Sequence, residues 1–378
     1  MLHGEIRKPS EGTVPVQRIL PRPIRTRRYL TLAPSRVNLG LIALAATLLG
    51  TEGLLRRPLL GEMTFSSIVL AEHLLLAVFA IPVAFAHRGK LAALSGRDWI
   101  ALLAIGWGAS AGAALLFTKA LASGNPTTAS LLQNMQPLIV VVLAMIILKE
   151  RISRFYWPCL IAALLGAYLL SFGLLHPQSV LAVDDAATAG YALGAATLWG
   201  AGTVLGRIVL ARLSYVTLTA MRILLALPFV AVFAAGNGGL GESIGGIADA
   251  PIRITIAALG PGLAAVLLFY RGLGGTLASH ATLAEFMYPV AALAGNWAVL
   301  GIMISLTQLL GLLLVLTTLV TLGWISSSTS DMHPTTETAT VTVIDVSSPT
   351  THASARRLRS TQRSCPVRRR LCVRTPSG

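Results

Sequence analysis

The sequence predicts an all-α integral membrane protein with ten transmembrane helices, arranged as two inverted repeats of five helices. Three observations support this prediction. Of the 378 residues, 54% are hydrophobic and only 12% are charged, whereas a soluble domain carries about 25% charged residues. Ten stretches are each long and apolar enough for a spanning helix, which needs about 20 residues. The chain also repeats itself at an offset of about 152 residues.

The ten predicted spans are separated by short segments that carry charge or turn-forming residues, such as Arg56-Arg57-Pro58 and Gly236-Asn237-Gly238-Gly239. We expect neighbouring spans to pack as antiparallel helices, because a chain in lipid must satisfy its backbone hydrogen bonds internally. A transmembrane barrel would show short alternating segments instead of continuous apolar runs. The predicted spans cover residues 37–55, 63–86, 98–118, 127–148, 155–175, 187–206, 214–235, 252–272, 279–300 and 303–325.

Lysine and arginine in the short loops predict the orientation, since these residues accumulate on the cytoplasmic side. With the N-terminus inside, the inner loops hold nine of these residues and the outer loops hold three. Arg56 and Arg57 are the exception, because they would face outward. An even number of spans then places both termini in the cytoplasm, in a protein of the plasma membrane.

The two ends of the chain differ in composition from the apolar body. Residues 1–36 form a basic arm and residues 326–378 a Ser/Thr- and Arg-rich tail that we expect to be disordered, and these ends carry +6 and +5 of the net charge of +15. Such polar basic ends fit an anionic lipid surface better than nucleic acid. The three cysteines, Cys159, Cys365 and Cys372, form no disulfide or zinc pattern.

The internal repeat divides the body into residues 37–175 and 187–325. Leu115-Leu116-Phe117-Thr118-Lys119 matches Leu267-Leu268-Phe269-Tyr270-Arg271. Eighteen residues after each cation, a Met-x-Pro sequence ends in Pro137 or Pro289. An odd number of spans in each repeat inverts the second repeat in the membrane, an architecture that is typical of secondary transporters with a site between the repeats.

The two repeats and their motifs resemble the EamA-type family of the drug/metabolite transporter superfamily, and the resemblance covers about residues 40–325. The first half carries the family's Ala129-Ser130-Leu131-Leu132, Pro137 and Leu148-Lys149-Glu150-Arg151, and the second half opens with Leu198-Trp199-Gly200 and contains Arg222. Two positions depart from the pattern. Gly301-Ile302 stands where Gly-Glu is expected, and Glu72 stands where an arginine is common.

The resemblance implies a secondary transporter, with export as the expected direction, that moves a small polar or amphipathic metabolite or drug by alternating access. A proton gradient or the substrate gradient would drive it, because no nucleotide-binding motif is present. A passive channel-like or structural membrane protein is the alternative. A membrane enzyme would need clustered His, Asp or Glu at a surface, which the short loops do not supply, and we expect no cofactor and no metal. Whether two copies form a homodimer stays open.

Ionisable residues within the spans are candidate pathway residues, because they are costly in lipid. Glu72 and Arg222 occupy equivalent positions in the second helix of each half. They are expected on opposite sides of one central cavity, where they would form an ion pair, lock the bundle, or bind the two ends of a zwitterion. Glu52 is expected to pair with Arg56 one turn on. His73 lies about 100° around the helix from Glu72, so one of these two should face other helices instead of the cavity.

A second set of polar residues lies next to Pro137 and Pro289, each of which is expected to kink its helix. Proline removes a backbone hydrogen bond and frees a carbonyl group one turn upstream. A carboxylate at that depth, such as Glu285, could load a proton near neutrality because it is desolvated. Interhelical hydrogen bonding is the structural alternative. The predicted set comprises Gln133, Asn134, Gln136, His280, Glu285, Tyr288 and Asn296.

The orientation is testable by labelling from outside the cell. In a variant without Cys159, Cys365 and Cys372, a single cysteine placed at Glu5 or Arg370 should resist a membrane-impermeant maleimide until the membrane is permeabilised. Labelling of either cysteine in intact cells would contradict the inverted-repeat assignment.

Overall fold

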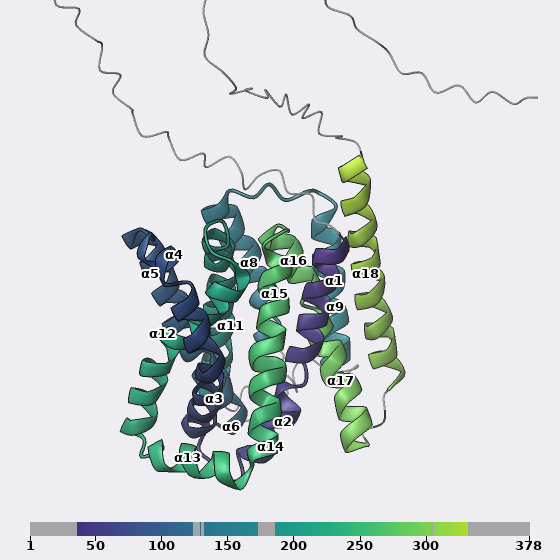
Figure 1. The fold of residues 1–378 in the computed structure, drawn as a ribbon. Coiled ribbons are helices and arrows are strands. Elements are labelled where there is room, and N and C mark those ends of the chain that lie inside the picture. The colour runs from purple at the N-terminus through teal and green to yellow at the C-terminus, as the bar shows by residue number, and fades with distance from the viewer. Residues whose placement is uncertain are drawn as a thin grey trace, which may run out of the picture. The chain divides into compact units, whose positions relative to one another are not determined.

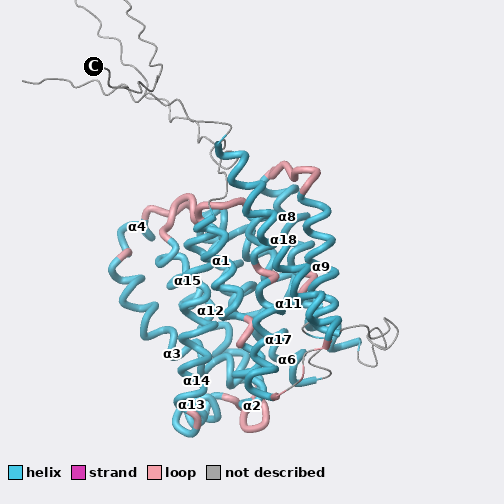
Figure 2. The backbone as a smooth tube through the Cα atoms, turned by 90° about the vertical axis from the view of Figure 1, so that its right-hand side faces the viewer, coloured by secondary structure: helices cyan, strands magenta, loops and turns pink. Residues whose placement is uncertain are grey.

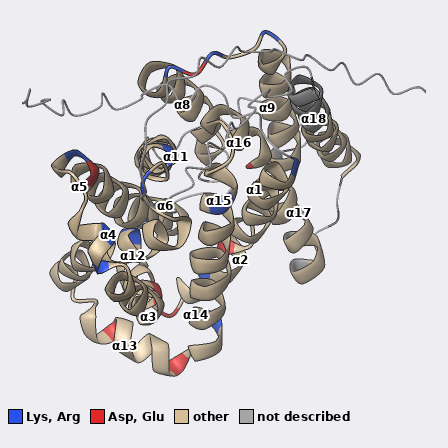
Figure 3. Cartoon of the chain, turned by 45° about the horizontal axis from the view of Figure 1, so that its top comes forward, with Lys and Arg blue, Asp and Glu red and all other residues tan. Residues whose placement is uncertain are grey.

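The computed structural model describes residues 36–123, 129, 132–172, 186–301, 303 and 305–331, except for the side chains of residues 296, 300 and 322–331. These residues all belong to one compact unit, residues 1–334. Within them the chain forms helices and no strand, and most of the long helices run side by side (Figures 1 and 2). Most of the ribbon in Figure 3 carries no charge, as expected for helices that face lipid.

Six helices in the described part of the chain are long and apolar enough to cross a membrane. Three are single elements: α3 (Phe65–Ala86), α11 (Ala186–Val209) and α12 (Tyr215–Gly236). The other three are composite. They are α1 (Arg36–Leu49) with α2 (Glu52–Leu59); α5 (Gly96–Leu103), η2 (Ala104–Gly112) and α6 (Ala113–Ser123); and α14 (Pro251–Ala257), η4 (Ala258–Ala264) and α15 (Ala265–Leu273).

The remaining predicted spans coincide with shorter or interrupted helices, or with α18, whose side chains are described only as far as Thr321, so the structure does not by itself establish ten spans. These helices are α8 (Gln136–Leu143) with η3 (Ala144–Leu148), α9 (Tyr156–Phe172), α16 (Ala278–Ala284), α17 (Met287–Leu300) and α18 (Leu306–Asp331). Two short helices, α4 (Arg88–Ala92) and α13 (Leu240–Asp249), lie in the connections that follow α3 and α12. Gly238 has a φ of +71° in the turn before α13, which confirms the break predicted there.

One predicted break is wrong. Arg56-Arg57-Pro58 lies inside α2 instead of in an outer loop, and the arginine side chain at position 56 is only 5% exposed. The ion pairs described below allow this arginine to be buried. At the other end of the chain, α18 continues to Asp331, six residues into the segment predicted to be disordered, and residues 332–378 lie outside the described part, as do residues 1–35.

The repeat is visible in the third helix of each half. Both third helices contain a π-helical segment near their middle, η2 in the first half and η4 in the second. A π segment holds an extra residue in the turn and often occurs at functional sites. Pro261 lies within η4 and removes one backbone donor there. Residues from both π segments border the cavity described below.

The cations at the ends of these third helices make the same contact in both halves. The Lys119 Nζ atom lies 5.0 Å from the ring centroid of Phe65, the first residue of α3. Arg271 lies over the ring of Tyr215, the first residue of α12, and donates to its hydroxyl at 3.2 Å. Each cation therefore ties the end of the third helix to the start of the second, a shared structural task.

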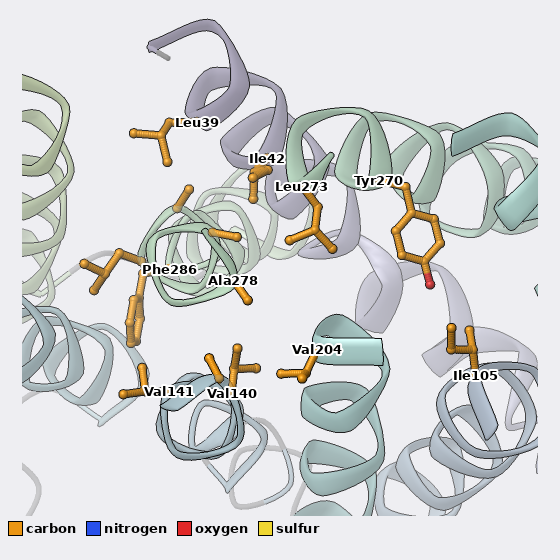
Figure 4. Close-up of a cluster of buried hydrophobic side chains, with 14 of the residues drawn as sticks. Leu39, Ile42, Ile105, Val140, Val141, Val204, Tyr270, Leu273, Ala278 and Phe286 are labelled. Atoms are coloured by element: carbon orange, nitrogen blue, oxygen red, sulfur yellow. The ribbon is translucent and has the colours of Figure 1, made fainter. Parts of the chain in front are cut away.

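The core is formed by small and branched side chains from both halves. Figure 4 shows Leu39 of α1, Val140 of α8, Val204 of α11 and Leu273 of α15 in one buried cluster. Close helix packing depends on glycine, because a Cβ atom at Gly106 in η2 would lie 2.6 Å from the Cβ atom of Leu225 in α12.

Substitution of this glycine tests the helix packing. Gly106→Ala should lower the melting temperature in detergent, at a cost of about 1–3 kcal/mol, because α12 must move away from η2. Gly40→Ala is the matched control, since Gly40 lies on α1 with no atom within 4 Å of its Cβ position. Equal melting temperatures of the two variants would contradict the packing.

Candidate functional site

A cavity of about 160 Å³ lies among helices from both halves of the chain. Its wall is mainly apolar and includes the aromatic side chains Trp199, Phe269 and Phe286. A set of polar side chains interrupts this apolar wall. They are Glu52, Arg56, Glu72, His73, Ser110, Gln133, Asn134, Gln136, Thr203, Arg222, Tyr270, Glu285 and Tyr288.

Arg56 stands at the centre of a buried ion-pair cluster. It forms the predicted ion pair with Glu52 one turn earlier. It also donates to both carboxylate oxygens of Glu72 on α3, from Nε at 3.0 Å and from Nη2 at 2.5 Å. A further hydrogen bond joins Nη1 to the Thr118 hydroxyl at 3.1 Å. All three residues of this Glu52–Arg56–Glu72 cluster are less than 10% exposed, so one buried guanidinium group meets two buried carboxyl groups.

Arg56 is not among the residues that the sequence predicts for the site. Its spacing of four from Glu52 was the available signal, but the next Arg57-Pro58 pair resembled the end of a helix. The contact with Glu72, 16 residues away, follows only from the packing of α2 on α3.

Glu72 and Arg222 both border the cavity, but they do not form an ion pair with each other. Each is the eighth residue of a 22-residue helix, α3 or α12, as the repeat predicts. Glu72 is instead held by Arg56. Among the described residues, Arg222 donates only to neutral groups: Ser110 Oγ at 3.3 Å, the Tyr270 hydroxyl at 3.3 Å and the Ala109 carbonyl oxygen at 3.4 Å.

Both Glu72 and His73 reach the cavity, so the expectation that one of them faces away is wrong. The two side chains extend from α3 in different directions. Glu72 meets α2, whereas His73 Nε2 lies 3.5 Å from Ser110 Oγ of η2. His73 Nδ1 lies 2.8 Å from the Val69 carbonyl oxygen, one turn earlier in α3. The cavity therefore extends far enough around α3 to contact both side chains.

The helices that carry Pro137 and Pro289 are interrupted in both halves. A turn at Asn134 and Met135 precedes α8, and a turn at Glu285 and Phe286 separates α16 from α17. Each turn keeps right-handed helical dihedrals and is bridged by i→i+3 backbone hydrogen bonds, such as Met135 N–H to Leu132 O and Phe286 N–H to Leu283 O. The helix is therefore interrupted locally, just before each proline.

These two breaks bring polar side chains from both halves together. Gln136 Nε2 donates to Glu285 Oε2 at 2.7 Å. The other oxygen, Glu285 Oε1, is buried and has no hydrogen-bond partner among the described residues, and the same is true of Gln133 Oε1. Asn134 and Tyr288 complete this part of the wall. Five of the seven predicted polar residues therefore meet at one site, with the Gln133 and Glu285 oxygens left without a partner among the described residues.

The other two members of the predicted polar set are His280 and Asn296. His280 does not border the cavity but packs against Tyr156, with 5.7 Å between the ring centroids. The Asn296 side chain lies outside the described part of the structure.

Glu150 joins the two halves outside the cavity. It follows Lys149, which ends its helix in a left-handed conformation, and its carboxylate accepts from the backbone N–H groups of Ala278 at 2.8 Å and Ser279 at 3.1 Å. These are free donors at the start of α16, so Glu150 caps that helix. The equivalent position in the second half is Ile302, which cannot do the same.

Two further carboxylates join the halves at opposite ends of the bundle, one on α13 and one on α5 (Figure 1). Glu242 of α13 accepts from the Thr64 hydroxyl and the Ser67 hydroxyl, each at 2.6 Å, at the start of α3. Asp98 of α5 forms an ion pair with Arg212, just before α12 begins. Burial acts to raise the pKa of Glu242, but the hydrogen bonds from Ser67 and Thr64 outweigh it and hold this pKa below its ordinary value.

The composition of this wall suits the binding of a small solute. No group of three His, Cys, Asp or Glu residues in the described segments could hold a metal ion. The cavity instead offers hydrogen-bond donors, acceptors and aromatic surfaces.

Comparison with known proteins identifies the family. The EamA-like transporter family matches residues 38–172 and 187–324, which is more than half of the chain. The chain belongs to the EamA-like transporter family. It is therefore a multi-pass membrane transporter of a small molecule and not an enzyme, as the resemblance implied.

Two individual proteins are similar to this EamA-like transporter. The riboflavin transporter ImpX of Fusobacterium nucleatum subsp. nucleatum is 28% identical over 284 residues, which cover 74% of this chain and 95% of ImpX. A crystal structure described only as that of a protein has 17% identity and a TM-score of 0.59, and the match covers 78% of this chain and 98% of that one. The second likeness shows the fold alone.

Removal of Arg56 tests the buried cluster of this EamA-like transporter. Arg56→Gln should destabilise the protein by about 3–5 kcal/mol, because two buried carboxylates lose their cation. The double variant Arg56→Gln/Glu72→Gln should regain part of that loss, since one anion is gone. Thermal unfolding in detergent measures both effects, and an unchanged melting temperature for Arg56→Gln would contradict the cluster.

The Glu242 contact predicts a dependence of stability on pH. Because its pKa is lowered in the folded protein, the contact contributes its full stability above the ordinary value of 4.5 and loses it as the pH falls below that value. The wild type should therefore lose more thermal stability than Glu242→Gln on acidification from neutral pH to about pH 3.5. Identical pH profiles would show that this carboxylate makes no such contact.

Proposed function

We propose that this EamA-like transporter moves riboflavin or a closely similar ring compound across the plasma membrane. The observation that carries the proposal is the cavity between the two halves, which combines aromatic walls with unused hydrogen-bonding groups. ImpX supports this choice of substrate, because the similarity extends over 95% of that riboflavin transporter. Riboflavin has a flat ring system with carbonyl and N–H groups and a hydroxylated side chain, so it needs both kinds of surface.

The aromatic side chains of the wall come from several helices. Trp199 lies on α11, Phe269 and Tyr270 on α15, and Phe286 and Tyr288 at the start of α17. Aromatic faces and edges favour the stacking of another ring at centroid distances of about 4.5–7 Å. A wall of this kind suits a flat ring better than a sugar or an aliphatic amino acid.

We further propose that all ten helical stretches cross the membrane as two inverted repeats, with both termini in the cytoplasm. The interrupted helices at Pro137 and Pro289 support this arrangement, since interrupted helices at membrane depth are tolerated where they line a cavity. We keep export as the proposed direction and the surrounding bilayer as a partner. The proposal requires only one copy of the chain, because one chain forms the cavity.

Alternating access gives a role to the two carboxylate contacts between the halves. The Glu242 contact with Thr64 and Ser67 and the Asp98–Arg212 ion pair lie at opposite ends of the α3 and α12 pair. Each contact joins a connection of one half to the start of a helix of the other half. We propose that transport opens one contact while the other stays closed, which exposes the cavity to each side in turn.

Transport in proteoliposomes tests the proposed function directly. Purified protein in liposomes preloaded with unlabelled riboflavin should accumulate labelled riboflavin transiently, because a carrier exchanges the two. Unlabelled riboflavin outside should saturate the exchange. A passive channel would give flux without counterflow, and the absence of riboflavin flux would reject the substrate. Inside-out membrane vesicles test the direction.

Substitution of Glu285 tests whether transport is coupled to protons. No cation of the described residues forms an ion pair with it, and its Oε1 atom has no partner, so a proton or a substrate donor can occupy that oxygen. Glu285→Gln should fold and bind substrate but lose transport driven by a pH gradient, while counterflow continues. The matched control is Gln133→Glu, which adds a carboxylate at the repeat-related position.

Wild-type concentrative transport by Glu285→Gln, with an unchanged pH dependence, would remove Glu285 as the coupling residue. The proposal would then move to Glu72 and Arg222.

A further inference from the structure

The polar groups of the cavity differ in how completely the protein satisfies them. The carboxylate of Glu72 has both oxygens bound by Arg56, which in turn contacts Glu52 and Thr118. These groups have little capacity left for a ligand. Arg222 is different, because it is a cation at the cavity wall whose partners within the described segments are all neutral.

The contacts of Arg222 are also long. Its three hydrogen bonds measure 3.3–3.4 Å, whereas charge-assisted hydrogen bonds to a carboxylate are about 2.7–2.9 Å. A guanidinium group has five N–H donors in one plane, so two donors remain beyond these three contacts. Its carbon atom lies 5.6 Å from the ring centroid of Tyr270, which holds the group from one side.

No carboxylate in the described part of the chain forms an ion pair with Arg222. The repeat-related acid, Glu72, is the natural candidate, but Arg56 holds it. A cation inside a membrane bundle is costly unless an acceptor meets it. The neutral groups around Arg222 therefore position the guanidinium group without saturating it, and the cavity is where a stronger acceptor can approach.

We propose that Arg222 binds a flat substrate group with two neighbouring acceptor atoms, held side by side in the plane of the guanidinium group. A carboxylate offers two oxygens in this geometry, and the edge of a flavin ring offers a carbonyl oxygen beside an unprotonated ring nitrogen. The inference rests on the proposed transport of a solute through this cavity. It assigns the recognition of the acceptor-bearing edge of the ring to Arg222.

The unused oxygens elsewhere in the wall complement this assignment. Gln133 Oε1 is an acceptor, and Glu285 Oε1 is an acceptor in the unprotonated carboxylate, so both match hydroxyl or N–H groups of the substrate. A substrate with acceptors at its ring edge and hydroxyl groups on its side chain would therefore bind in one orientation, with the acceptors at Arg222.

Equilibrium binding to the purified protein tests this assignment with probes that separate the parts of the ligand. Riboflavin carries the ring and the polyol, lumiflavin carries the ring alone, ribitol carries the polyol alone, and benzoate carries a carboxylate on a flat ring. Arg222→Gln should weaken riboflavin and lumiflavin binding by roughly 10- to 100-fold, the effect of losing a hydrogen bond to a charged group. Arg222→Lys keeps the charge but not the planar pair of donors, so its affinity should lie between those of Arg222→Gln and the wild type.

The matched control is Arg253→Gln. Arg253 forms an exposed ion pair with Glu62 and does not border the cavity, so this variant should bind riboflavin within twofold of the wild type. All variants should keep the wild-type melting temperature in detergent within a few degrees. If Arg222→Gln does not fold, the binding affinity of Arg222→Lys is compared with that of the wild type instead.

The outcomes separate this inference from the proposed function. Riboflavin binding that is unchanged in Arg222→Gln and Arg222→Lys overturns the role of Arg222 and leaves the substrate standing. If the wild type binds benzoate through Arg222 but does not bind riboflavin, the proposed substrate fails and the role of Arg222 is supported. Ribitol binding that depends on Arg222 overturns the inference, and so does the absence of any binding that depends on Arg222.

Discussion

The constraint that governs this structure is that lipid supplies no hydrogen-bond partners, so every polar group inside the bundle must be satisfied by the chain or by what the cavity binds. The Glu52–Arg56–Glu72 cluster satisfies this constraint internally, as does the capping of α16 by Glu150. Arg222 and Glu285 do not reach the same completeness. Among the residues of the cavity wall, this difference separates those that hold the helices together from those that we propose meet the substrate.

The repeat provides a symmetric framework on which the two halves differ in charge. Both halves place a π segment in the third helix and a break before the proline of the fourth helix. Equivalent positions in this framework then carry different groups: Glu72 in one half and Arg222 in the other, Gln133 in one and Glu285 in the other. A cavity between such halves is lined by matched backbone and unlike side chains, so it can hold an asymmetric molecule in one orientation.

Much of the framework could be predicted from the sequence, because it depends on local patterns. Apolar runs of helical length locate the helices, and Pro137 and Pro289 mark the places where polar side chains of both halves meet. The spacing of Glu52 and Arg56 predicts their ion pair for the same reason. The resemblance to the EamA-type family, carried by short motifs, gives the correct family.

The partners across helices could not be predicted, because they depend on distant packing. The burial of Arg56 follows from Glu72 on another helix, and without that partner the arginine pair resembles a polar loop. The same pairing leaves Arg222 without the acid that symmetry suggests. The π segments and the contacts of Glu242 with α3 likewise arise from the fit between helices that are far apart in the chain.

The most direct test is an experimental structure of the full chain determined with riboflavin. The account predicts density for the ring within the cavity, with its carbonyl edge at Arg222, ring contacts to the aromatic wall, and the Glu52–Arg56–Glu72 cluster unchanged. Riboflavin bound elsewhere, or a structure in which Glu72 pairs with Arg222 and the cavity is filled by side chains, would contradict it.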